Sequence, residues 1–246
     1  MSFFGFRLTR ALLDLALPPR CHLCRVLIEE DDAVQLCPRC LDTLPLLTSP
    51  CCSRCGQPFE GAGEDHPCSR CLHASPPWEQ ARAAMLYEQD CRELIQRFKF
   101  RHETRLRRPL ALLIARQLAD FATNAAADCL IPVPLHLRRL RERGFNQSLL
   151  LAEQLSNSWK LPLLRQALRR TRWTTPQIEL DAEHRAANLQ HAFSVTAPEQ
   201  ILNKRIMLVD DVFTTGATLA ECSRTLRAAG ASAVYAVTAA RAPAPP

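Results

Sequence analysis

The stretch Arg205–Leu219, RIMLVDDVFTTGATL, constrains the fold of this chain more than any other feature of its sequence. Its apolar run Ile206–Val209 is typical of a fully buried strand. Two carboxylates, Asp210 and Asp211, follow at once, and a helical stretch begins near Leu219. We therefore expect an α/β fold in which this strand brings the acidic pair to the carboxyl edge of a parallel sheet, where such folds bind their ligands.

A small, hydroxyl-rich turn separates the predicted strand from the predicted helix. Backbone N–H groups and hydroxyls at a helix N-terminus suit a phosphate, and Gly216 permits a tight turn and the close approach of an anion. The acidic pair lies at a spacing that suits the hydroxyls of a sugar attached to that phosphate. The alternative is a plain strand–turn–helix corner with a solvated acidic pair, but the pattern is long and ordered. The turn comprises Thr214, Thr215, Gly216, Ala217 and Thr218.

The stretch LVDDVFTTGATL resembles the signature with which type I phosphoribosyltransferases bind phosphoribosyl pyrophosphate (PRPP). The resemblance implies a phosphoribosyltransferase-like sheet flanked by helices. It implies that Asp210 and Asp211 hold the ribose hydroxyls, that residues 214–218 hold the 5-phosphate, and that Mg²⁺ binds together with PRPP.

Eight cysteines form two quartets of equal spacing, which makes an internal repeat with an offset of 31 residues. Each CxxC pair lets two thiolates face one ion, and two pairs complete a closed tetrahedral site. A closed site leaves no open position, so we expect structural zinc, one or two ions per chain. A disulfide framework is the competing interpretation, but no secretory signal accompanies it. The predicted ligands are Cys21, Cys24, Cys37 and Cys40, and then Cys52, Cys55, Cys68 and Cys71.

Two details of these metal sites stay open in the sequence. The quartets can bind ions sequentially or as an interleaved cross-brace, and their equal spacings favour sequential use. Cys51 and His66 lie nearby and can substitute as ligands. Cys91, Cys129 and Cys222 lack partners at metal spacing, and buried thiols are the default for them.

Ser75-Pro76-Pro77 stiffens the chain and blocks a helix, so we place a domain boundary there. Residues 1–75 are predicted to form a zinc-ribbon-like domain that is too small to fold without its ions. Residues 76–246 are predicted to form the phosphoribosyltransferase-like domain. Its predicted strands are Ala81–Tyr87, Cys129–Val133, Ile206–Val209 and Ala233–Thr238, and its predicted helices are Asp90–Phe100, Pro109–Phe121, Ser148–Ser156 and Leu219–Ala229.

The N-terminal stretch Met1–Arg20 fits an amphipathic helix that docks on the second domain or lies peripherally on a membrane surface. Arg7, Arg10 and Asp14 interrupt its apolar residues, so it suits neither a signal peptide nor a membrane span. With no other apolar stretch long enough to cross a bilayer, we expect a soluble cytoplasmic protein.

The net charge is +6, and the basic residues cluster in segments 92–108, 138–143 and 165–172. Such clusters suit a polyanion, either nucleic acid or a highly phosphorylated small molecule. Solvated helix faces explain such runs equally often. Cations alternate with aromatic rings at the end of the predicted helix 90–100, which favours single-stranded nucleic acid. The predicted contacts are Arg97, Phe98, Lys99, Phe100 and Arg101.

The predicted strand 129–133 leads into a basic, glycine-punctuated loop, Pro134–Gln147. In phosphoribosyltransferases the corresponding loop holds the pyrophosphate, and clustered arginines suit that charge. Arg143 is then a catalytic residue that stabilises the leaving group, together with Asp210 and Asp211. The resemblance assigns Pro134, Arg138, Arg139, Arg143 and Gly144 to this loop. It also gives Arg170–Phe193 the place of the flexible catalytic loop, with Arg185 and Asn188 on a closing helix.

Tandem CxxC pairs, a basic loop ending in RGFNQ, the segment TTPQ and the stretch LVDDVFTTGAT together resemble the ComF/GntX family over nearly the whole chain. These are competence-type, phosphoribosyltransferase-like proteins with an N-terminal zinc finger. The resemblance implies a role in natural transformation, where incoming single-stranded DNA is handled in the cytoplasm. PRPP, single-stranded DNA and competence DNA-uptake proteins are the partners it implies.

Two classes of function follow from these features. In the first, a nitrogen nucleophile displaces pyrophosphate from PRPP, as in nucleotide or nucleoside metabolism. In the second, a module that kept the fold grips the backbone of single-stranded DNA. The acidic pair and the turn favour PRPP binding, whereas arginines outside the predicted pocket favour DNA. The motifs specify neither the acceptor nor whether transfer takes place.

Overall fold

A computed structural model describes residues 18–28, 34–173 and 189–243. Most of the predicted N-terminal amphipathic helix and most of the predicted catalytic loop, including Arg185 and Asn188, lie outside the described residues. Within those residues, no helix is long and apolar enough to cross a bilayer.

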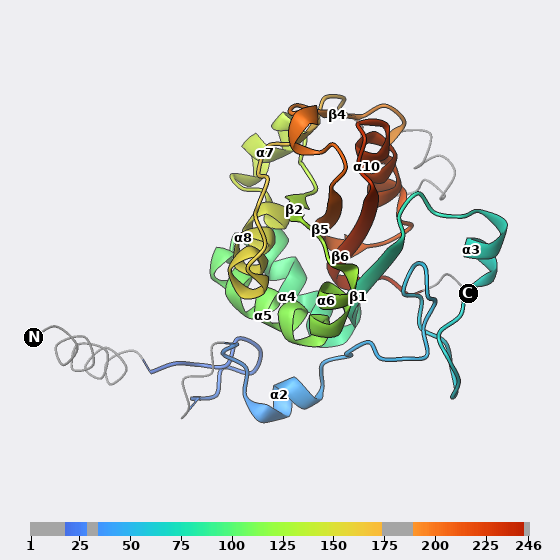
Figure 1. The fold of residues 1–246 in the computed structure, drawn as a ribbon. Coiled ribbons are helices and arrows are strands. Elements are labelled where there is room, and N and C mark those ends of the chain that lie inside the picture. Colours follow the sequence, from blue (N-terminus) through green and yellow to red (C-terminus); the bar gives the residue numbers. More distant parts are fainter. Residues whose placement is uncertain (1–17, 29–33, 174–188, 244–246) are drawn as a thin grey trace, which may run out of the picture.

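A four-stranded parallel sheet forms the centre of the molecule (Figure 1). Its strands lie in the order β1-β6-β5-β2, so β5 and β6 are central. Nearly every residue of β5 and β6 is buried, as expected when helices cover both faces of a parallel sheet. The predicted α/β class is thereby confirmed. The strands are β1 (Gln80–Leu86), β2 (Cys129–Pro132), β5 (Arg205–Phe213) and β6 (Ala233–Arg241).

Helices cover the two faces of the sheet unequally (Figure 1). One face carries α4 (Gln89–Phe100), α5 (Arg107–Gln117), α6 (Ala119–Ala125) and α8 (Gln147–Trp159). The other face carries α10 (Ala217–Ala228) and a two-stranded antiparallel sheet of β3 (Leu168–Arg170) and β4 (Phe193–Val195). The remaining short helices are α2 (Pro38–Asp42), α3 (Ser69–His73), α7 (Leu137–Arg143), η1 (Thr104–Leu106) and η2 (Pro198–Gln200).

The observed elements differ from the predicted ones mainly at three places, while β6 and α8 each end about three residues later than predicted. The single helix predicted over 109–121 is two helices, α5 and α6, which meet at Leu118. The predicted basic loop contains the helix α7, which His136 caps by accepting a hydrogen bond from the Arg138 N–H at 3.2 Å. The strand β5 extends four residues past Val209, because its pairing with β6 continues to Phe213.

The cysteine-rich segment packs against both faces of the sheet. Buried residues of the first quartet, with Val34 and Leu36, belong to the core that contains α4, α5 and α8. Buried residues of the second quartet, with Trp78, belong to the core on the α10 side. The domain boundary at residue 75 stays a prediction. Among the described residues, each cysteine quartet shares an apolar core with one face of the sheet.

Candidate functional site

A cavity of about 270 Å³ opens at the edge of the sheet where the parallel strands have their carboxyl ends. The loops after β1, β2 and β5 line it, together with side chains from α4, α8 and β3. Seven residues that the sequence predicted for PRPP lie there: Pro134, Arg139, Arg143, Asp210, Asp211, Thr214 and Thr218. Lys99 and Phe100, which were predicted for nucleic acid, line the same cavity.

Asp210 lies near the end of β5 and is 9% exposed. Its Oδ1 accepts hydrogen bonds from the Ser148 hydroxyl at 2.8 Å and from the Asp211 N–H at 2.9 Å. Burial, followed by the negative charge of Asp211, raises the pKa of Asp210 to about 7. Asp210 is therefore largely buried although it lines the cavity.

Asp211 is 3% exposed and forms an ion pair with Lys99. The Lys99 Nζ lies 2.9 Å from Oδ2 and 3.1 Å from Oδ1 of this carboxylate. Lys99 therefore lines the cavity, and its predicted contact with nucleic acid stays a prediction. The ion pair also fixes the end of α4 to the end of β5.

The predicted phosphate turn joins β5 to α10. Gly216 is the N-cap of α10 with a φ of +82°, a conformation that favours glycine. A Cβ at this position would lie 2.8 Å from Cζ of Phe213, so the backbone packs directly on that ring. Thr214 and Thr218 line the cavity, while the Thr215 hydroxyl accepts a hydrogen bond from the Ala217 N–H at 3.4 Å. The N-terminus of α10 therefore opens toward the cavity.

Arginines form part of the wall of the cavity that the acidic pair also lines. Arg143 donates to Oε1 of Gln147 at 2.7 Å, and its guanidinium lies 5.3 Å from the centre of the Phe100 ring. Burial lowers the pKa of Arg143, and burial followed by the charge of Arg139 lowers that of Arg170. Several cations that partly repel one another line a small space, which favours an anion there.

A second, larger groove of about 620 Å³ adjoins the cavity and shares Lys99, Phe100, Arg139 and Arg143 with it. Arg138 lines the groove but not the cavity. Its guanidinium lies 4.8 Å from the centre of the Trp173 ring and forms an ion pair with Glu142. Gly144 lies just outside both hollows, where its φ of +76° ends α7. The predicted pyrophosphate loop is thus divided between two adjoining spaces.

Two of the predicted nucleic-acid residues lie in the core. Phe98 is 0% exposed and packs near Phe145, with ring centres 5.8 Å apart. Arg97 is 2% exposed, and its guanidinium binds the Glu103 carboxylate at 2.8 and 2.9 Å and the His22 carbonyl oxygen at 2.5 Å. Neither side chain can contact a strand on the surface, so both assignments are corrected. Phe100, which is 62% exposed, and Arg101 remain on the surface.

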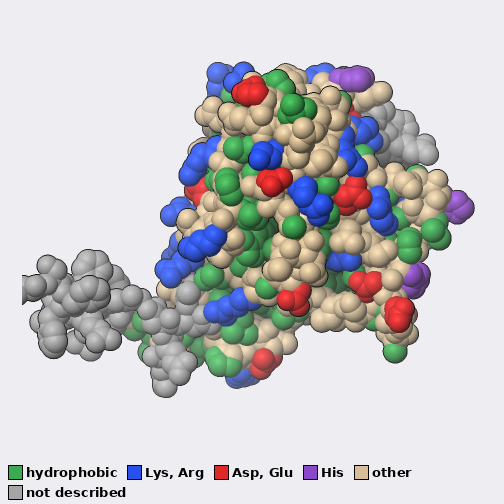
Figure 2. Space-filling view, viewed as in Figure 1, with side chains coloured by type: hydrophobic (Ala, Val, Ile, Leu, Met, Phe, Trp, Pro, Cys, Tyr) green, Lys and Arg blue, Asp and Glu red, His purple; other side chains and the backbone are tan. Residues whose placement is uncertain are grey.

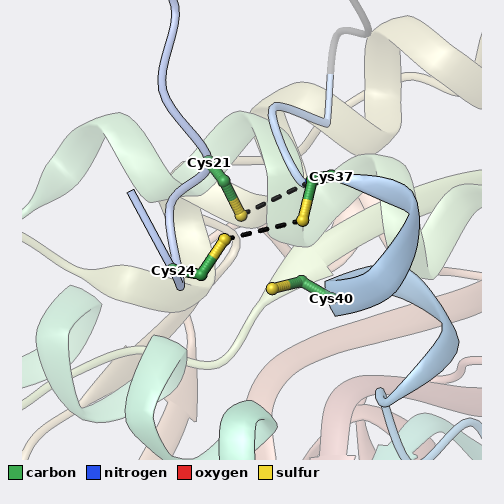
Figure 3. A group of neighbouring side chains, drawn as sticks. All are labelled: Cys21, Cys24, Cys37 and Cys40. Carbon is green, nitrogen blue, oxygen red and sulfur yellow. Dashed lines mark hydrogen bonds between the residues drawn. The ribbon is translucent and has the colours of Figure 1, made fainter. Parts of the chain in front are cut away.

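The cysteines gather in two separate clusters of four within the described residues. In each cluster the sulfur atoms lie within 4.8 Å of one another, and Figure 3 shows the four side chains of the first cluster pointing inward. Among the described residues each cluster consists of one whole quartet, which is the sequential arrangement and not a cross-brace. Cys51 donates to Asp65 instead, and His66 stacks on Phe59. Among the other predicted thiols, Cys91, Cys129 and Cys222 are buried.

The chemistry of both clusters fits structural zinc. Burial alone would raise the pKa of the Cys52 thiol, but N–H groups of Cys55 and Cys68, 3.4 and 3.2 Å from its sulfur, help to lower that pKa to about 6. Cys21 receives a similar bond from the Cys37 N–H at 3.4 Å. A thiolate is the form that binds metal. The backbone N–H groups stabilise the thiolate form of Cys21 and Cys52 and so favour metal binding.

Sequence reasoning missed Ser148 and Tyr87 as residues of the cavity, and it named Gln147 and Arg170 only as ends of the two predicted loops. Asn146 marks the start of α8, because its side chain accepts hydrogen bonds from the N–H groups at 148 and 149. That local signal could place Ser148 in the first turn of a helix. It could not show that the hydroxyl reaches a carboxylate 62 positions away.

The chain is similar to a known domain family in its N-terminal part and to a solved structure over about half of its length. The family described as "Double zinc ribbon domain" matches residues 12–72. A solved structure described as "structure of the allosteric regulatory enzyme of purine biosynthesis" is 21% identical, with a TM-score of 0.35, and the match covers 54% of this chain and 25% of that one.

Three curated relatives match most of the chain. "Competence protein F" of Haemophilus influenzae is 36% identical over 185 residues, which cover 74% of this chain and 80% of the relative. "DNA utilization protein YhgH" of Escherichia coli K12 is 34% identical over 89% of this chain and 96% of its own length. "Competence protein ComFC" of Bacillus subtilis is 28% identical over 84% of this chain and 83% of its own length.

Proposed function

The chain belongs to the ComF family of competence proteins, and on this premise we propose that it binds PRPP with Mg²⁺ and handles single-stranded DNA in the cytoplasm during natural transformation. The names of its relatives, which refer to competence and to DNA utilisation, support this role. The proposal that the chain binds PRPP rests on the chemistry of the cavity at the carboxyl edge of the sheet.

The observation that carries PRPP binding is one cavity with a buried acidic pair, an arginine wall and a helix N-terminus. Asp210 and Asp211 would accept hydrogen bonds from the two ribose hydroxyls, and such charge-assisted bonds are strong. The turn 214–218 would hold the 5-phosphate with its N–H groups and hydroxyls. Arg139 and Arg143 would hold the pyrophosphate.

The two carboxylates also offer oxygen donors of the kind that Mg²⁺ prefers. Magnesium bound with PRPP would neutralise part of the pyrophosphate charge. Lys99 would have to release Asp211, or share it, as the ribose enters. These residues therefore fit the cation as well as the sugar.

A second candidate is an active phosphoribosyltransferase in nucleotide or nucleoside metabolism with no direct role on DNA. A nitrogen nucleophile would form a bond to the anomeric carbon while the bond from that carbon to the pyrophosphate oxygen breaks, and the nitrogen would then lose a proton. Arg143 would stabilise the charge that develops on the departing pyrophosphate. The intact cavity favours this candidate, whereas the names of the relatives favour the first.

PRPP binding can be tested by thermal unfolding with PRPP and Mg²⁺. A ligand that binds only the folded state raises the melting temperature, and at about 100 times Kd it adds about 2.7 kcal/mol of stability. We expect the double variant Asp210→Asn, Asp211→Asn to lose this shift. Thr214→Ala should reduce it less, because backbone N–H groups of the turn remain.

The control is Asp120→Asn, an exposed carboxylate in α6, which should keep the full shift. An absent shift in the wild-type protein at saturating PRPP would refute the proposal. A shift that persists in the double variant would move the ligand away from the acidic pair.

DNA handling is proposed for the second groove, because an exposed ring, Phe100, and a half-buried ring, Trp173, lie there beside cations. Phe100 and Trp173 would stack on bases, and Arg138 and Arg139 would contact phosphates. Figure 2 shows further Lys and Arg side chains along the left edge of the molecule. A strand in this groove would lie next to the PRPP cavity, since the two spaces share residues.

Binding of an oligo-dT strand at several salt concentrations separates the two kinds of contact. Arg138→Ala should weaken binding and reduce the slope of log K against log salt by about one unit. Phe100→Ala should weaken binding by about 1–3 kcal/mol with an unchanged slope, because stacking releases no counterions. Arg227→Ala, in α10 near the opposite edge of the sheet, should change neither quantity. Equal results for Arg138→Ala and Arg227→Ala would contradict this assignment of the groove.

A further inference from the structure

Arg241 is a buried arginine at the end of β6, 3% exposed, that faces the second cysteine cluster. Its guanidinium donates to the Cys55 carbonyl oxygen at 2.8 Å and to Oε1 of Gln57 at 3.0 and 2.7 Å. In the part of the chain that the structure describes, Arg241 forms no ion pair with a carboxylate. A buried cation is costly unless opposite charge lies near it.

The second cysteine cluster supplies that charge. Four thiolates around one Zn²⁺ carry a formal charge of −2. The Cys55 carbonyl that Arg241 binds belongs to a cysteine of this cluster, so the cation lies next to the residues that would hold the metal. The position of the Arg241 side chain is therefore coupled to an intact, metal-loaded ribbon.

The other face of Arg241 lies on the ring of Phe213, with the guanidinium carbon 4.3 Å from the ring centre. Trp78 meets the same ring edge-on, with ring centres 5.8 Å apart. The indole N–H of Trp78 donates to the carbonyl oxygen of Arg54 at 3.1 Å. Arg54 lies between Cys52 and Cys55, so both neighbours of the Phe213 ring are anchored in one CxxC knuckle.

The phosphate turn rests on these two rings. A Cβ at Gly216 would lie 2.8 Å from Phe213 and 3.1 Å from Trp78, so the backbone of the turn packs closely on both rings. A displacement of either ring would therefore change the packing that holds the turn in place. Thr214 and Thr218 of the same turn line the cavity. A continuous set of contacts thus runs from the metal ligands to the residues around the proposed 5-phosphate position.

We propose that the second zinc ribbon positions the phosphate turn through Arg241, Trp78 and Phe213, so that PRPP affinity depends on an intact ribbon that PRPP does not touch. Arg241 is a positioning residue in this scheme. The inference rests on the proposed PRPP function for its effect on affinity, but the positioning itself can be measured without ligand.

The test compares Arg241→Gln with Arg205→Gln in the zinc-loaded protein. Arg205 is a matched control, since it also donates to backbone carbonyls, of Ala125 and Ala126, and lies 5.4 Å from the centre of the Tyr235 ring, but at the start of β5. Arg241→Gln should weaken PRPP binding at least about tenfold, because hydrogen bonds of a charged group are lost. Arg205→Gln should bind PRPP with the wild-type Kd.

Hydrogen exchange of the amides at 213–218 gives the readout that needs no ligand. These amides should exchange faster in Arg241→Gln than in Arg205→Gln. If Arg241→Gln does not fold, Trp78→Phe serves in its place, since it keeps an aromatic ring but loses the N–H bond to the knuckle. Wild-type exchange of 213–218 in these variants would overturn the inference. Absent PRPP binding in the wild-type protein would refute the proposed function alone, and exchange would still decide whether the ribbon positions the turn.

Discussion

Burial of the Asp210 carboxylate costs free energy when the chain folds, and the proposed role of Asp210 in ligand binding explains why it is retained. Because its pKa rises from about 3.8 in the unfolded chain to about 7 in the fold, the folded protein binds more protons than the unfolded chain between these pH values. The free energy of unfolding therefore falls as pH rises from about 4 to about 7. Such a cost is typical of residues that serve a ligand rather than the fold.

We predict that Asp210→Asn stabilises the ligand-free protein at pH 8 relative to the wild type, by roughly 2–4 kcal/mol from the size of the pKa shift. At pH 4, where the wild-type carboxyl group is protonated, the two proteins should be nearly equal in stability. Chemical denaturation at both pH values measures the difference. An equal difference at both pH values would mean that the carboxylate is not destabilised by burial, whereas the control Asp120→Asn should show no such pH dependence.

At the scale of the element, α4 shows why a basic run cannot be assigned from sequence. Successive residues of a helix point about 100° apart, so neighbours in the run 97–101 face different surroundings. Arg97 and Phe98 face the core, whereas Lys99 and the largely exposed Phe100 line the cavity. The alternation of cations and rings predicted a nucleic-acid surface but carried no information about which residues share a face.

Features that depend on local geometry could be predicted. The turn 214–218 and the eight clustered cysteines lie in short segments whose spacing identified them, although the pairing of the quartets came only from the structure. The contacts of Ser148 with Asp210 and of Arg241 with Cys55 join distant parts of the chain, 62 and 186 positions apart. Such contacts follow from the packing of helices on the sheet, which local patterns do not specify.

At the scale of the whole molecule, the two ribbons extend the cores on the two faces of the sheet. Leu36 and Leu44 near the first ribbon are buried in the same cluster as Leu94 and Leu151. The second ribbon shares its cluster with Leu219 and other residues of α10. Small metal-binding modules fold only with their ions. Loss of zinc therefore removes apolar cover from both faces of the sheet, and the sheet domain should not survive unchanged.

We predict that the purified protein carries two zinc ions per chain and that a strong chelator lowers the melting temperature of the entire protein. Because the ribbons and the sheet share cores, thermal unfolding in the chelator should remain one transition at a lower temperature. The signals to compare are far-ultraviolet circular dichroism, which reports on the helices around the sheet, and elemental analysis of zinc. The same chelator saturated with zinc should leave the melting temperature unchanged.

Variants of one quartet at a time distinguish the two sites. Cys37→Ser with Cys40→Ser should remove one ion and destabilise the face that carries α4 and α8, and Cys68→Ser with Cys71→Ser should do the same for the face that carries α10. Hydrogen exchange of α8 and of α10 measures each face separately, and each pair of substitutions should raise exchange mainly on its own side. If the sheet domain instead unfolds at its original temperature after both ions are lost, the ribbons are an independent domain. The boundary predicted at residue 75 would then mark a true division of the chain.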